Sequence, residues 1–123
     1  MNLGDTFLMG NPGGRTKHLW IVISDPKKHH GNFVIVNLTS DPVRGEKACA
    51  VKKGEHPWLT TSDSYVVFGD AFEVTAEKSK LITNGIGGCI IAQPPMKREV
   101  IARIVEAAKC SKAFAMKLLK YLD

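Results

Sequence analysis

The sequence predicts a small, mainly antiparallel α+β domain, most economically a compact barrel, with a short internal helix and helices near its C-terminus. Short runs rich in β-branched and aromatic residues alternate with Gly, Pro and Asn clusters, a pattern typical of strands and turns. The chain has 123 residues, of which 44% are hydrophobic and 24% charged. This size and composition predict one globular domain spanning residues 1–123.

The clearest predicted element is a β-hairpin formed by residues 18–24 (HLWIVIS) and 33–40 (FVIVNLTS). The eight residues between the two runs are polar or turn-forming. Each run is too short for a stable independent helix, and its β-branched content favours a strand.

The ends of this hairpin matter most for function. If Ser24 lies opposite Phe33, paired residue numbers sum to 57 and His18 lies opposite Thr39. Opposed side chains in an antiparallel pair have Cβ atoms roughly 4.5 to 5.5 Å apart. The imidazole of His18 and the hydroxyl of Thr39 are therefore predicted to reach one common substrate.

A short strand over residues 5–9 is followed by a loop, residues 10–17 (GNPGGRTK), with three glycines and two basic residues. The loop lacks the spacing of a phosphate-binding loop and leads into a strand instead of a helix. Because it ends at His18, a phosphate held near that histidine would meet Arg15 and Lys17 first.

The remaining strands are predicted from apolar runs at residues 48–51, 64–74 and 89–93. Residues 54–60 are expected to be an edge or a loop because Pro57 cannot donate to a central ladder. At Gly69 and Asp70 the sequence allows either a tight turn or a bulge.

Three helices complete the predicted domain. A short helix begins near Thr75, a longer one covers residues 96–109, and Ser111 caps a final helix. The longer helix carries one apolar stripe, and the final one has apolar residues on one face, so both are expected to lie on the sheet.

The cysteines and loop histidines do not predict a metal or disulfide framework. Cys49, Cys89 and Cys110 are odd in number and widely spaced, so buried thiols are expected. His29 and His30 lie in the hairpin loop without nearby carboxylate or thiol ligands. No metal site and no cofactor is therefore expected.

The charge distribution is compatible with an anionic partner. Between residues 97 and 120, seven Lys or Arg less two Glu equal the whole net charge of +5. A solvated helix face explains most runs of this kind. No apolar stretch approaches the roughly 20 residues of a membrane span, and the N-terminus does not resemble a secretory signal, so a cytoplasmic location is expected.

Several local features resemble the MazF/PemK family of bacterial toxins, with a divergent pattern. These are GDTFLM near the start, the Gly-rich basic loop, HLWIVIS in the place of a strand beginning RP, and VNLTS in the place of a hydroxyl-bearing strand. The resemblance implies an SH3-like barrel that cleaves single-stranded RNA without a metal. It also implies a homodimer inhibited by an acidic antitoxin protein.

The family uses an arginine at the start of the second strand and a Thr or Ser at the end of the third. Here Thr39 matches the hydroxyl position, whereas His18 stands in place of the arginine and Leu19 in place of the following proline. The departure implies either that His18 substitutes for arginine, or that this branch uses its barrel differently.

The predicted chemistry follows from the residue types. Metal-free cleavage needs a base for the 2′-hydroxyl proton and an acid for the departing 5′-oxygen, and histidine, with a reference pKa of about 6.5, suits either role. Thr39 would bond the phosphate, while Arg15 and Lys17 would hold its charge. His56 is a further candidate for RNA contact, since Pro57 fixes the chain direction and Trp58 can stack on a base.

The alternative is a non-catalytic SH3-like module that binds protein or nucleic acid. In that case His18 is a partly exposed histidine at a strand start, and Thr39 is an ordinary strand residue. A toxin-like barrel that inhibits a protein target is a third reading, because a fold alone does not determine function.

Overall fold

The structure is a computed structural model that describes residues 1–10, 17–41, 43, 45, 49–83 and 90–122. Its strands are β1 (Thr6–Gly10), β2 (Lys17–Val22), β3 (Phe33–Thr39), β4 (Ala50–Val51), β5 (Ser64–Val74) and β6 (Ile91–Gln93). The α-helices are α1 (Ala76–Thr83) and α2 (Arg98–Cys110), and the short 3-10 helices are η1 (Pro26–Lys28) and η2 (Met116–Tyr121). The predicted α+β class is confirmed.

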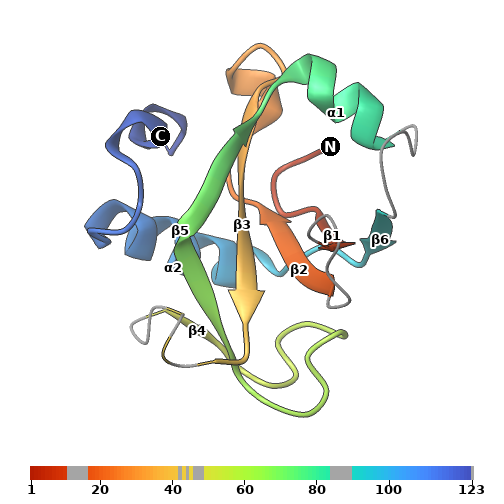
Figure 1. Cartoon of the computed structure of the whole chain (residues 1–123), viewed down its shortest axis with the longest axis vertical. Coiled ribbons are helices and arrows are strands. Elements are labelled where there is room, and N and C mark those ends of the chain that lie inside the picture. The colour runs from red at the N-terminus through yellow and green to blue at the C-terminus, as the bar shows by residue number, and fades with distance from the viewer. Residues whose placement is uncertain (11–16, 42, 44, 46–48, 84–89, 123) are drawn as a thin grey trace.

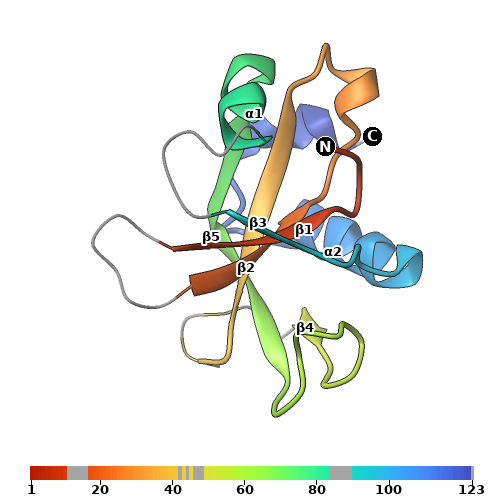
Figure 2. The ribbon, with the colours of Figure 1, turned by 90° about the vertical axis from the view of Figure 1, so that its right-hand side faces the viewer.

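The six strands form one sheet in the order β4-β5-β3-β2-β1-β6, and every neighbouring pair is antiparallel. The sheet curls into a half barrel, with β5 and β3 running through its length (Figure 1). Seen from the side, β1 and β2 cross β3 at a steep angle, and α2 lies beside the sheet (Figure 2). The mainly antiparallel prediction is therefore confirmed.

The hairpin of β2 and β3 has the predicted register. Trp20 pairs with Asn37, Ile21 with Val36 and Val22 with Ile35, so each pair of numbers sums to 57. Beyond the strand end, the Ser24 hydroxyl accepts a hydrogen bond from the Val34 N–H at 2.8 Å. A serine hydroxyl can thus continue the closure of the hairpin where the backbone ladder ends.

β5 is one continuous strand with an irregularity in its middle, so of the two alternatives at Gly69 a bulge-like distortion is observed and a tight turn is not. Ile35 pairs with Phe72 but Asn37 pairs with Val67, which leaves residues 68–71 opposite Val36 alone. Such an insertion bends the strand and increases its twist. The irregularity shifts the pairing of β5 with β3 by an odd number of residues. Even-numbered residues of β5 after the irregularity therefore lie on the same face of the sheet as odd-numbered residues before it.

Two apolar clusters form on the two faces of the sheet. The first lies between the sheet and α2 with the C-terminal segment, and its buried side chains are at most 6% exposed. The predicted stripe of α2 enters this cluster through Val100, Ile101, Ile104 and Ala108. The second cluster comprises Phe7, Trp20, Val22, Phe33, Ile35 and Val74. Both faces of β2 and β3 are therefore buried, which fits their nearly continuous apolar sequences.

The internal helix begins where the sequence predicts. The Thr75 hydroxyl accepts from the Lys78 N–H at 3.3 Å, and the Asn32 side chain accepts from the Ala76 N–H at 2.9 Å. These bonds satisfy two of the free N–H groups at the start of α1. Gly31 beside Asn32 has φ +87°, and a Cβ there would lie 2.9 Å from that of Ala76.

The prediction for Ser111 is wrong. Ser111 ends α2, with its N–H bonded to the Ala108 carbonyl at 3.2 Å, and the following chain is extended at Ala115. The last helical segment is accordingly the 3-10 helix η2. Its apolar face is nevertheless buried as predicted, through Leu118 and Tyr121.

The cysteines divide between core and surface. Cys49 is buried, as predicted, whereas Cys110 is exposed because it lies on the outer side of the last turn of α2. Cys89 lies outside the described residues. Across the helices that the structure describes, none is both long enough and apolar enough to cross a membrane.

Candidate functional site

His18 and Thr39 line one pocket, here called the rim pocket, with a volume of about 290 Å³. It lies where β3 ends, beside the loop that follows β4 in the lower part of Figure 1. The hairpin register accounts for the proximity, because β2 and β3 keep the same offset up to the pair Trp20 and Asn37. The other lining residues are Leu38, Ser40, Trp58, Leu59, Thr60, Thr61, Ser62 and Ser64.

Thr39 is the last residue of β3 and is 8% exposed. Its hydroxyl oxygen accepts a hydrogen bond from the Asp41 N–H at 3.1 Å. A hydroxyl group has one hydrogen to donate and can accept as well. The Thr39 O–H is therefore free to donate into the pocket, toward an anionic oxygen, while the backbone fixes the position of its oxygen.

His18 is half-buried and pairs with Met9 of β1. It is two residues from Trp20 along β2, so both side chains lie on the same face of the sheet. Within the described part of the chain the His18 ring has no hydrogen-bond partner. One ring nitrogen is thus available to accept a proton and the other to donate one.

His56 does not share this position. Its ring is 1% exposed, Nδ1 accepts from the Trp58 N–H at 3.1 Å, and Nε2 lies 2.6 Å from the Pro94 carbonyl oxygen. The Thr6 hydroxyl also donates to the Pro94 oxygen, at 2.7 Å, and its own oxygen is 3.1 Å from Nε2. The bonds assign the neutral tautomer with hydrogen on Nε2. This burial argues against the predicted RNA contact of His56, because the ring faces the interior.

Trp58, two residues after His56 in the same loop, is exposed beside the rim pocket and not buried in the interior. Trp58 is 38% exposed and lines the rim pocket, and the buried His56 ring holds the Trp58 backbone in place. An exposed indole beside a pocket offers an apolar face for stacking. The buried histidine therefore shapes the pocket wall without touching the pocket.

The loop that carries His56 and Trp58 is fastened to α2 by an ion pair. Glu55 accepts hydrogen bonds from both terminal nitrogens of Arg103, at 2.6 and 3.1 Å, and Arg103 also donates to the Ala50 carbonyl at 3.1 Å. The hydrogen bonds from Arg103 hold the pKa of the Glu55 carboxyl below its usual value. They raise the pKa of Arg103 in turn. The loop backbone is thus restrained close to the rim pocket.

Two predicted cationic groups fall partly or wholly outside the described residues. Arg15 lies in the segment that is not described. Lys17 is the first residue of β2, and its backbone pairs with Gly10 directly beside the pair of His18 and Met9. Only the backbone position of Lys17 is described, and Lys17 directly precedes His18 of the rim pocket.

The hydroxyl groups of the loop before β5 were not predicted as site residues from the sequence. Residues 58–64 read WLTTSDS, and Thr60, Thr61, Ser62 and Ser64 all line the rim pocket. A run of four hydroxyls in five positions was a usable signal. It could not be assigned to a site because nothing local places this loop beside the end of β3.

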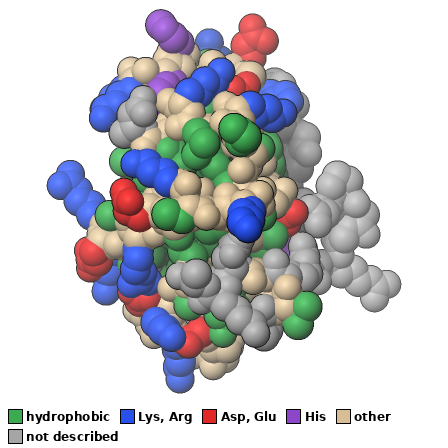
Figure 3. Space-filling view, turned by 90° about the vertical axis from the view of Figure 1, so that its left-hand side faces the viewer, with side chains coloured by type: hydrophobic (Ala, Val, Ile, Leu, Met, Phe, Trp, Pro, Cys, Tyr) green, Lys and Arg blue, Asp and Glu red, His purple; other side chains and the backbone are tan. Residues whose placement is uncertain are grey.

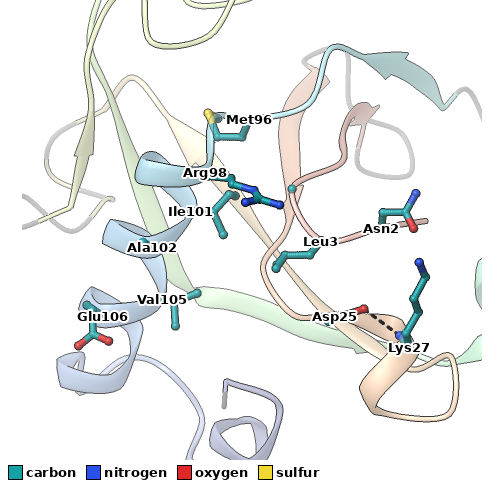
Figure 4. A pocket seen from close by; sticks show the side chains of 11 residues that line it. Asn2, Leu3, Asp25, Lys27, Met96, Arg98, Ile101, Ala102, Val105 and Glu106 are labelled. Atoms are coloured by element: carbon teal, nitrogen blue, oxygen red, sulfur yellow. Dashed lines mark hydrogen bonds between the residues drawn. The ribbon is translucent and has the colours of Figure 1, made fainter.

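A larger cavity lies elsewhere, between the N-terminal segment, η1 and α2, with a volume of about 790 Å³. Figure 4 shows Leu3, Ile101 and Val105 facing it, with Arg98 reaching across toward the N-terminal segment. Asp25, on its border, accepts from the Lys27 N–H at 2.9 Å. None of the predicted site residues lines this cavity.

The rim pocket combines one imidazole, several hydroxyls and one exposed indole, a set suited to binding a phosphate and an aromatic base. Among the described residues, no group of three His, Cys, Asp or Glu side chains is arranged to hold a metal ion. Compared with known proteins, the sequence matches no protein-family model and no curated protein.

Proposed function

We propose that the protein is a metal-independent endoribonuclease of the MazF/PemK-like type, with an SH3-like barrel and its active site in the rim pocket. The observation that carries the proposal is that His18 and Thr39, the two residues chosen from the sequence, line the same pocket. The resemblance of the first 40 residues supplies the reaction class. On the same basis, an acidic antitoxin and a second copy of the chain are the proposed partners.

In this mechanism the 2′-hydroxyl of one ribose attacks the adjacent phosphorus. His18 accepts the hydroxyl proton while solvent protonates the departing 5′-oxygen, or His18 donates the proton to the 5′-oxygen as the P–O bond breaks while solvent accepts the proton of the 2′-hydroxyl. The Thr39 hydroxyl donates a hydrogen bond to a phosphate oxygen, on which negative charge grows during the attack. The products are a 2′,3′-cyclic phosphate and a 5′-hydroxyl, so no water is consumed in the cleavage step.

Two further groups support this chemistry. Trp58, which is exposed in the lining of the rim pocket, is proposed to stack on a base next to the scissile phosphate. Arg15 and Lys17 are proposed to supply the fixed positive charge that the described lining of the pocket lacks. That charge would hold the phosphate near His18 before reaction.

The test is incubation of the purified protein with single-stranded RNA in EDTA, with mass analysis of the product ends. We expect His18→Ala to slow cleavage by about 100-fold or more, the usual contribution of general acid or base catalysis. Thr39→Val should slow it by a comparable factor because the hydrogen bond is lost, while Thr39→Ser retains most activity.

The matched control is His30→Asn. His30 is an exposed histidine with φ 56°, a conformation that Asn tolerates, and it lies in the hairpin loop. This variant should cleave at the wild-type rate. Wild-type rates in both His18→Ala and Thr39→Val, with folding intact, would contradict the assignment.

The second candidate is a binding module without catalysis. Among the described residues that line the rim pocket, His18 is the only titratable side chain, so the described lining supplies no partner acid or base. The cavity of Figure 4, which has both apolar and charged side chains in its lining, offers such a module a surface for protein contacts. RNA binding by the wild-type protein without any cleavage in EDTA would favour this reading.

A further inference from the structure

A third cavity, of about 360 Å³, lies on the edge of β5 at the opposite end of that strand from the rim pocket. It is lined by residues 71–73 of β5, by Lys78 of α1, and by Lys117, Leu118 and Lys120 of η2. We call this surface the lysine edge. Figure 3 views the molecule from this side and shows basic side chains around a small apolar patch in its upper half.

The three lysines have no carboxylate partner within the described part of the chain. Lys52 and Lys109, in contrast, pair with acidic side chains at 3.4 and 3.6 Å. Three ammonium groups around one cavity repel each other, and a bound anion removes that cost. Lysine is a flexible point charge with three donors, which suits a phosphate group.

The one acidic residue that lines the lysine edge is already engaged. Glu73 accepts a hydrogen bond from the Tyr121 hydroxyl, and this bond raises the pKa of Tyr121. Glu73 is one negative charge against the three lysines of the described lining, and its hydrogen bond is made to a neutral donor and not to a lysine. The lining retains an excess of positive charge.

An aromatic ring completes the surface. Phe72 is 39% exposed, and its ring makes an edge contact with Trp20 at a centroid distance of 5.3 Å. This contact places the exposed ring at the border of the cavity, on the face of the sheet that carries Trp20, whereas η2 packs against the other face through Leu118. A nucleobase can stack on such a ring, whereas an acidic peptide needs only the charges.

The lysine edge is connected to the rim pocket across the sheet. Phe72 packs on Trp20, which is two residues from His18 on the same face of β2. Along β5, Ser64 of the rim pocket and Phe72 are separated by eight residues, at most about 26 Å of extended chain. A single strand of several nucleotides can therefore reach both places.

From this combination we propose that the lysine edge is a second binding site for single-stranded RNA, remote from the rim pocket. Lys78, Lys117 and Lys120 hold the phosphates, and Phe72 stacks on a base. The RNA identity rests on the proposed function, while the site itself rests on the cavity, on three lysines without a carboxylate partner among the described residues, and on the exposed ring beside them. Its role is to add affinity for longer strands.

The test is fluorescence anisotropy of labelled 2′-O-methyl oligouridine of about 12 and about 3 nucleotides, which lacks the attacking hydroxyl and resists the proposed cleavage, titrated with the full chain at several salt concentrations. We expect Lys117→Gln with Lys120→Gln to weaken binding of the longer strand by about tenfold. The slope of log K against log salt should fall by about 1.4, since each phosphate contact contributes about 0.7 for single strands. Binding of the short strand at the rim pocket should not change.

Phe72→Leu should weaken binding of the longer strand by about fivefold or more, without changing the salt slope. The matched control is Lys109→Gln with Lys112→Gln, which removes the same charge from exposed residues outside the cavity. An equal loss of affinity in the control and the Lys117/Lys120 pair would overturn the proposal. Displacement of RNA by polyglutamate, with Phe72→Leu binding RNA normally, would assign the edge to an acidic protein segment instead.

The nuclease proposal and the lysine-edge proposal can be refuted independently of each other. Salt-dependent loss of binding in the lysine variants, without cleavage by any form of the protein, would retain the lysine edge and remove the nuclease. Cleavage that depends on His18, with unchanged binding in the lysine variants, would do the reverse.

Discussion

The two ends of β5 carry the two candidate binding surfaces, and they are built in opposite ways. At the Ser64 end, the loop before the strand is held by an internal hydrogen-bond network around the buried His56 ring and by the ion pair of Glu55 with Arg103. At the Phe72 end, the lysines surround the edge with no ion pair among the described residues. The Ser64 end is held by buried hydrogen bonds and an ion pair, whereas the three lysines at the Phe72 end have no carboxylate partner among the described residues.

Because of this difference, substitutions at one end should change the stability of the fold, and substitutions at the other should change the binding of a partner. Substitutions within the network around His56 should destabilise the fold, because buried polar groups lose their partners. Substitutions of the exposed lysines should change binding to an anion and leave folding nearly unaffected. Each end can therefore be perturbed with a different expected readout.

The largest effect is expected at His56. His56→Leu leaves the Trp58 N–H without its acceptor and the Pro94 carbonyl without one of its donors, so the free energy of unfolding should fall by about 2–4 kcal/mol. Urea denaturation measures this loss. Lys117→Gln, at the other end, should stay within about 0.5 kcal/mol of wild type. Equal destabilisation by the two substitutions would break the comparison.

The next effect is expected at Gly31, where the hairpin loop packs closely against α1 near the Phe72 end of β5. Gly31 and Gly54 both have positive φ, but a Cβ on Gly31 would lie 2.9 Å from that of Ala76, whereas nothing lies within 4 Å of one on Gly54. Gly54→Ala should cost about 1 kcal/mol for its backbone conformation. Gly31→Ala should cost about 1–2 kcal/mol more, because it also pushes α1 from the hairpin loop. Thermal unfolding of the pair should separate them by several degrees, with Gly31→Ala the less stable.

The smallest effect concerns pH. The folded pKa of Glu55 lies below its usual value of 4.5, so its bond with Arg103 stabilises the fold above that pH and is lost as pH falls through the folded pKa. Because both side chains are partly exposed, at 23% and 46%, the contribution should be about 1 kcal/mol or less. Glu55→Gln should flatten the stability profile below pH 4.5.

The control for this pH effect is Glu106→Gln. Glu106 is 75% exposed and lies 3.6 Å from Lys109, so its removal should leave the profile unchanged. A parallel profile for wild type and Glu55→Gln would show that the ion pair contributes nothing to stability. The loop would then be held by the His56 bonds alone.

The hairpin was predictable in detail because its information is local. Alternation and turn composition determined which residues of β2 and β3 face each other, and the observed pairs from Trp20 to Val22 agree with the predicted sum. The start of α1 was predictable for the same reason, since Thr75 caps it three residues before Lys78.

The environment of His56 was not predictable, because its partners are remote in sequence. Pro94 is 38 residues away and Thr6 is 50 residues away, so no local pattern distinguishes this buried ring from the half-buried ring of His18. The same limit applies to the hydroxyls of residues 58–64. Their position beside Thr39 depends on how the loop packs, and the irregularity of β5 depends on the curl of the whole sheet.

The irregularity in β5 also bears on how the protein behaves at high concentration. A long, straight border of a sheet is a template on which other molecules can add strand after strand, the first step toward amyloid. In β5 the alternation of side chains reverses across residues 68–71, so a straight strand cannot pair in register along its whole length. The charged side chains beyond that point oppose stacking further. The feature that curves the sheet thus also protects the chain from forming fibrils.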